Sequence, residues 1–161
     1  MKALESYLND HLAGSVGALE LVEHWAQLHD CKPLGAFFSD IGTDIRADQV
    51  TLRDLMRRMA IDESNVRKAG AWAAEKAGRA RLTIAGYEPG SLGLVLTLEG
   101  LIMGVTGKRL MWRVLAARHL PQLSGYDFKE LERRAEQQIE RIEAERIRAV
   151  RDALAGTSGL Q

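Results

Sequence analysis

The sequence is poor in the residues that cross-link or interrupt a chain. Its 161 residues include three prolines and a single cysteine, Cys31. One cysteine cannot form an internal disulfide, and no Cys/His cluster has the spacing of a zinc finger. Few prolines leave room for long helices, and the frequent Ala, Leu, Arg and Glu favour them. The composition therefore predicts an all-α protein, and the length fits one domain.

The sequence also lacks an excess of charge of either sign. Acidic and basic residues number 22 each, so no overall field attracts nucleic acid or an acidic membrane. No run reaches the ~18 uncharged apolar residues of a membrane-spanning helix, because Glu99 interrupts the most apolar stretch. The first turns carry acidic and polar residues, unlike a signal peptide. We expect a cytoplasmic protein that binds neither nucleic acid nor membrane.

Apolar residues at helical spacing predict four long helices. These helices span residues 4–29, 34–59, 91–119 and 126–154. An additional helix is predicted at about 63–84, and residues 155–161 are expected to form a flexible tail. The stretch 91–119 is apolar on every side, which is typical of a helix surrounded by others.

Helices of this length pair as two hairpins, and the segment between the hairpins is long enough to run the length of a bundle. The predicted fold is a ferritin-like four-helix bundle in the order up-down, long crossover, up-down, as one domain over residues 1–154. Ala73 and Ala77 of the crossover are expected to pack against Gly100 or Gly104, since small residues permit close approach.

Two segments resemble a known family. Residues 98–112, LEGLIMGVTGKRLMW, resemble the third bundle helix of the small bacterial YciE-type ferritin-like stress proteins. In that family a glutamate ligand is followed eight residues later by glycine, as Glu99 is followed by Gly107 here. The stretch DIRADQVTLRDLMRRM is similar to the family's acid-rich second helix. The resemblance implies a ferritin-like bundle and a stress-related setting.

A ferritin-like di-metal centre takes one carboxylate from each of two helices and Glu-x-x-His from each of the others. The candidate positions are the gaps in the four apolar stripes. These are Ser15, Asp48, Glu99 and Gln138, with Thr51 and Ile142 where the histidines would stand. Two carboxylates remain and no Glu-x-x-His occurs in the chain. We therefore expect a vestigial site without a metal cofactor.

Iron or manganese remains the alternative, with Asp48 and Glu99 as candidate ligands of one divalent ion. Without a metal, these carboxylates need hydrogen-bond donors if they are buried. The candidate donors are Arg79 and Arg81 of the crossover and Lys108 or Arg109 of the helix that carries Glu99. An arginine of the crossover is the preferred donor, because Lys108 is too far along the helix to pair with Glu99.

Three functions stay open. The leading interpretation is a non-catalytic ferritin-like bundle with a structural or interaction role, with no catalytic residue assigned. The first alternative is a metal-dependent oxidase or peroxidase. The second is a small-molecule carrier with a pocket between bundle and crossover, for which the glycines of 100–107 make room.

The adjacent aromatic residues Phe37 and Phe38 suggest self-association. Neighbouring residues on a helix point about 100° apart, so both cannot share one core stripe. An exposed apolar side chain often marks a partner site. We expect a homodimer with Phe37 or Phe38 at or near its interface.

Overall fold

Four α-helices form a bundle in a computed structural model that describes residues 2–63, 91–118 and 120–155. The elements are α1 (Lys2–Leu28), α2 (Pro33–Arg58), α4 (Leu92–Ala117), the 3-10 helix η1 (Pro121–Leu123) and α5 (Phe128–Ala155). The predicted all-α bundle is confirmed, and each end of its four helices lies within two residues of the prediction. The predicted helix at 63–84 and tail at 155–161 fall, apart from one residue each, outside the described residues.

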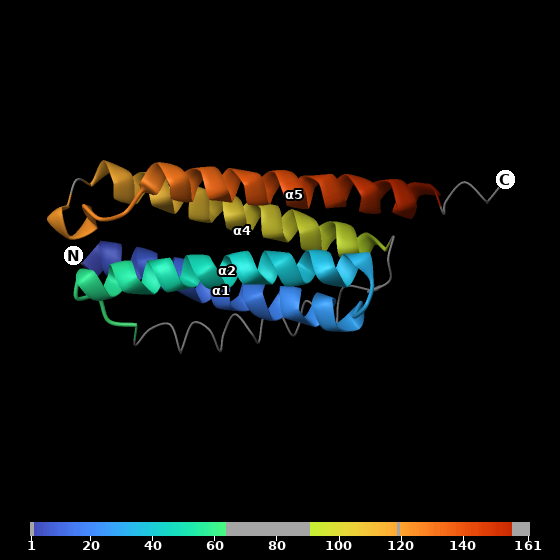
Figure 1. The fold of residues 1–161 in the computed structure, drawn as a ribbon, viewed down its shortest axis with the longest axis horizontal. Coiled ribbons are helices and arrows are strands. Elements are labelled where there is room, and N and C mark those ends of the chain that lie inside the picture. The colour runs from blue at the N-terminus through green and yellow to red at the C-terminus, as the bar shows by residue number, and fades with distance from the viewer. Residues whose placement is uncertain (1, 64–90, 119, 156–161) are drawn as a thin grey trace.

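The helices form two antiparallel hairpins, α1–α2 and α4–α5, which lie against each other (Figure 1). α2 ends at one end of the bundle and α4 begins at the other, so these two helices run in the same direction. The second hairpin is therefore traversed down-up, whereas the sequence prediction was up-down. The reason is geometric, because α4 begins at the end of the bundle where α2 also began.

Local chemistry explains where three of the helices begin. Ser91 precedes α4, and its hydroxyl oxygen accepts a hydrogen bond from the backbone N–H of Leu94 at 3.2 Å. Asp127 precedes α5, and its carboxylate accepts from the N–H of Glu130 at 3.0 Å. Both contacts satisfy backbone donors that have no partner within the helix. Pro33 opens α2, where the missing N–H costs nothing.

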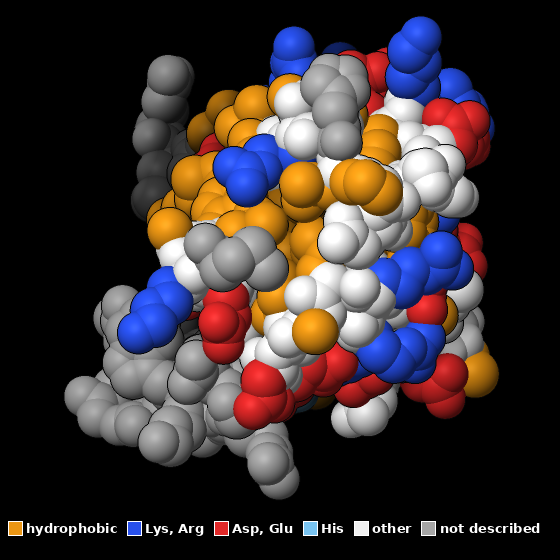
Figure 2. Space-filling view, turned by 90° about the vertical axis from the view of Figure 1, so that its left-hand side faces the viewer, with side chains coloured by type: hydrophobic (Ala, Val, Ile, Leu, Met, Phe, Trp, Pro, Cys, Tyr) orange, Lys and Arg blue, Asp and Glu red, His pale blue; other side chains and the backbone are white. Residues whose placement is uncertain are grey.

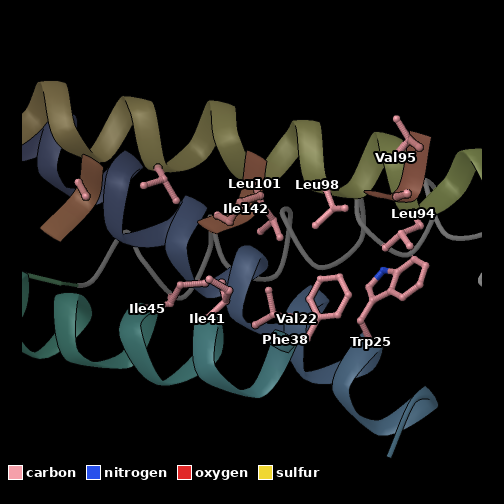
Figure 3. Packing of buried hydrophobic residues seen from close by; sticks show 13 residues of the cluster. Val22, Trp25, Phe38, Ile41, Ile45, Leu94, Val95, Leu98, Leu101 and Ile142 are labelled. Carbon is pink, nitrogen blue, oxygen red and sulfur yellow. The ribbon is translucent and has the colours of Figure 1, made fainter. Parts of the chain in front are cut away.

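Buried apolar side chains form two clusters along the bundle. The first lies towards the N-terminal end of α1 and includes Leu8, Leu12, Leu55, Met111, Trp112 and Leu115. In the second, Val22, Trp25 and Phe38 face the apolar side of α4 (Figure 3). Trp25 and Trp112 are at most 1% exposed, so both are core aromatics.

One face of α4 is exposed, so the prediction of a helix buried on every side is wrong. Five of its large apolar side chains are between 44% and 71% exposed: Leu92, Leu96, Met103, Leu110 and Val114. Spacings of four and seven residues place them along one side of the helix. Figure 2 shows hydrophobic side chains gathered on one side of the bundle in the end-on view. Among the described residues, no helix is long and apolar enough to cross a membrane.

Phe37 and Phe38 lie at different depths in the first hairpin. Phe38 is fully buried and stacks on Trp25, with 5.3 Å between ring centroids. Phe37 is half-buried and packs edge-on against Phe38 and the same apolar cluster. Phe38 is therefore excluded from a surface contact of the folded chain. The homodimer itself stays a prediction.

Gly35 offers a test of how the first hairpin is closed. A Cβ atom at this position would lie 2.1 Å from the carbonyl oxygen of His29. We expect Gly35→Ala to lower the free energy of unfolding by about 1–3 kcal/mol, because backbone atoms must move apart. Gly100→Ala is the matched control, since its Cβ would meet no described atom within 4 Å. It should raise that free energy by up to about 1 kcal/mol. Urea unfolding measures both, and equal effects would contradict the packing.

Candidate functional site

A buried polar layer joins α2, α4 and α5 between the apolar clusters. The Lys108 ammonium group donates hydrogen bonds to a carboxylate oxygen of Asp48 and to the amide oxygen of Gln138. The Gln138 amide nitrogen donates to the same Asp48 oxygen at 3.1 Å. The Asp48 and Lys108 side chains are only 6% and 15% exposed. Each of these three polar side chains thus has a hydrogen-bond partner in a region that little water reaches.

Arg134 adds a second cation to this layer. Its guanidinium nitrogen lies 3.1 Å from the other Asp48 oxygen, as an ion pair without hydrogen-bond geometry. Burial lowers the pKa of the Lys108 ammonium group, and the negative charge of Asp48 opposes that effect. The layer therefore contains two cationic groups for one carboxylate.

The structure brings together two of the four predicted inward positions. Asp48 and Gln138 are hydrogen-bonded to each other. Ser15 lies on α1, and its hydroxyl group donates to the backbone oxygen of Leu12 at 2.7 Å. Ile142 is fully buried and belongs to the second apolar cluster.

Glu99 and Thr51 are not part of the layer. The Glu99 side chain is 45% exposed, and its carboxylate lies 3.4 Å from the guanidinium group of Arg146 on α5. The apolar residues around Glu99 in the sequence predict that it is buried. That prediction is wrong, because some of these residues lie on the exposed face of α4. Thr51 donates a hydrogen bond to the backbone oxygen of Ala47 in its own helix and makes no hydrogen bond to the layer.

Lys108 is one of the candidate donors from the sequence, and it pairs with Asp48 rather than with Glu99. The preferred donors, Arg79 and Arg81, lie outside the described residues. The sequence does carry a signal for Lys108, because it shares a helical stripe with Leu101, Val105 and Trp112, all of which are buried. A cation in such a stripe needs an acceptor on a neighbouring helix.

A cavity of about 450 Å³ lies beside the polar layer, between α1, α2 and α4. Asp48 and Lys108 form part of its wall, together with apolar side chains such as Leu52, Leu101 and Met111. Its other wall residues on α1 and α4 are Tyr7, Asp10, His11, Gly14, Ser15, Ala18, Gly100, Met103, Gly104, Val105, Gly107 and Trp112.

Glycines keep this cavity open. An added Cβ at Gly14, Gly100 or Gly104 would meet no described atom within 4 Å, whereas at Gly107 it would lie 3.7 Å from the His11 ring. Burial lowers the pKa of that ring and so favours neutral imidazole near pH 7, although the negative charge of Asp10 opposes this shift. The wall of the cavity is thus mostly apolar and small, with its charge concentrated at Lys108 and the aspartates.

The residues of the layer do not fit a di-metal centre. Two metal ions need several carboxylate or imidazole ligands, but Asp48 is joined here by an ammonium group and an amide. A cation at this point would be repelled by Lys108 and Arg134. Within residues 2–63, 91–118 and 120–155, no three His, Cys, Asp or Glu side chains are grouped to hold a metal.

Comparisons with protein-family models, with curated proteins and with solved structures find no match to this chain. The relationship to YciE-type ferritin-like proteins therefore stays a prediction from the sequence.

The buried ion pair can be tested by a double-mutant cycle. We expect Lys108→Met to lower the free energy of unfolding by about 3–5 kcal/mol, because it leaves the Asp48 carboxylate buried without its closest cation. The double variant Asp48→Asn/Lys108→Met removes both charges and keeps an amide beside Gln138. It should lose less stability than the sum of the two single variants. Urea unfolding of the four proteins measures the coupling, and strict additivity would contradict a direct pair.

Metal content tests the donor set. Protein purified without chelator should contain well under one iron or manganese ion per chain, because Lys108 and Arg134 lie where a cation would bind. Elemental analysis by mass spectrometry gives the stoichiometry. Two ions per chain would contradict the interpretation of the polar layer.

Proposed function

We propose that this chain is a non-catalytic helical bundle that binds a small apolar molecule in the cavity between α1 and α4. The observation that carries the proposal is the cavity itself. Its volume of about 450 Å³ falls within the range of about 300–1,000 Å³ that ligand pockets occupy. Its wall combines many apolar groups with a few polar ones, as in sites that orient a small ligand.

The glycines in the wall support a role in binding. Glycine within a helix costs about 1 kcal/mol relative to alanine. Packing among the described residues does not require glycine at positions 14, 100 and 104, since an added Cβ would enter open space there. Larger residues at these positions would narrow the cavity. The sequence thus accepts lower helix stability where it leaves room for a ligand.

The proposal develops the small-molecule carrier among the three functions left open by the sequence. A metal-dependent oxidase is less well supported, because its ligands would have to come from a layer that holds an ammonium group beside its one carboxylate. The structural or interaction role draws support from the exposed apolar face of α4. That face, however, gives no indication of a partner, whereas the cavity defines the size and polarity of its ligand.

Binding of a neutral apolar probe tests the proposal. N-phenyl-1-naphthylamine, which fluoresces more strongly in apolar surroundings, should bind saturably with one site per chain. Gly104→Leu should weaken this binding at least tenfold, because the new side chain extends into the cavity from an open position. Fluorescence titration measures the affinity, and circular dichroism confirms that the variant is folded.

Ala116→Leu is the matched control for that variant. Ala116 is exposed on the same helix and does not line the cavity. The control should bind the probe as the unmodified protein does. Absence of saturable binding to the unmodified protein, or equal binding to the Gly104→Leu variant, would overturn the proposed function.

A further inference from the structure

Among the described residues, three buried side-chain atoms of the cavity's wall residues make no hydrogen bond, and two of them are donors. The side-chain nitrogens of Gln49 and Trp112 are buried and have no acceptor among the described residues. Both residues line the cavity and are at most 6% exposed. The amide oxygen of Gln49 is already engaged, because it accepts from Arg53 at 3.2 Å. Buried donors without acceptors are costly, so an acceptor supplied by a ligand would be stabilised here.

Lys108 adds charge to this set of donors. Its ammonium group has three N–H bonds, of which Asp48 and Gln138 receive two. Lys108 and Gln138 both donate to the same Asp48 oxygen, and the other Asp48 oxygen accepts no hydrogen bond but is held in the ion pair with Arg134. The other aspartate of the wall, Asp10, is exposed to solvent. The polar end of the cavity therefore favours an acceptor over a donor.

The charges of the layer favour an anionic ligand. Lys108 and Arg134 carry two positive charges and Asp48 carries one negative charge, while the nearby carboxylate of Asp44 is paired with Arg141. One further negative charge would neutralise the group. Isolated charge in surroundings of low polarity is unfavourable, so a monoanion gains more here than it would beside an exposed lysine.

We propose that the cavity binds a monocarboxylic acid with an aliphatic body. The carboxylate lies towards Lys108 and Gln49, and the hydrocarbon lies along the apolar wall that includes Leu101, Met103 and Met111. The inference rests on the proposed function and adds the chemical class of the ligand.

Three probes with the same hydrocarbon chain distinguish the contribution of the head group to the affinity from that of the hydrocarbon. Octanoate, 1-octanol and octylamine should each be titrated against the protein by calorimetry at pH 7. Octanoate should bind at least tenfold more tightly than either of the others. Equal affinities for octanoate and octanol would overturn the proposal of a carboxylate ligand but would not contradict the proposal of an apolar binding cavity. Failure of all three, together with failure of N-phenyl-1-naphthylamine, would overturn the proposed function as well.

Two variants locate the head group. Asp48→Asn/Lys108→Met removes both charges and should abolish the preference for octanoate over octanol. Gln49→Met removes one donor without touching the ion pair, so it tests the same end of the cavity if the double variant does not fold. The Gln49→Met variant should weaken the binding of octanoate several-fold and leave the binding of octanol unchanged. Lys129→Met, at an exposed lysine of α5 outside the cavity, is the control and should bind octanoate normally. An unchanged octanoate preference in the folded double variant, or in Gln49→Met, would overturn the proposal.

Discussion

The ion pair between Lys108 and Asp48 fixes how the two hairpins meet. It connects α4 to α2, and Gln138 extends the connection to α5. Apolar contacts tolerate small shifts along a helix, but buried charges must keep their partners. A shift of one hairpin by a single turn would separate Lys108 from Asp48 by about 5.4 Å. The polar layer therefore sets the relative position of the helices, and the two apolar clusters supply most of the buried area.

The same layer shapes the cavity. α1 contributes no charged partner to Lys108, and it presents Gly14, Ser15 and Ala18 on the side that faces α4. These small residues cannot fill the space beside the lysine stem, and Gly100 and Gly104 leave the opposite wall short of side chains as well. The cavity therefore has an apolar body and a charged end. Both features of the proposed ligand follow from this combination.

Glu99 illustrates how an apolar context can mislead. It stands in the most apolar stretch of the chain, which predicts burial, yet its carboxylate meets Arg146 at the partly exposed edge of α4. The stretch is apolar all round, but one of its faces remains exposed on the described bundle. Periodicity cannot orient a helix whose faces look alike. Lys108, nine residues further on, lies on the buried stripe and is the charged side chain of α4 that pairs with Asp48 inside the bundle.

The sequence by itself determined the helix boundaries and the all-α class, because Pro33, Ser91, Asp127 and the apolar periodicity act within a few residues of the chain. It also identified Asp48 and Gln138 as polar residues on inward faces. Only the tertiary structure decided their partners, since Lys108 and Asp48 are 60 residues apart and their contact depends on how α4 packs against α2. The cavity was decided in the same way. A glycine leaves space in any helix, but whether that space closes depends on the residues that face it from a neighbouring helix.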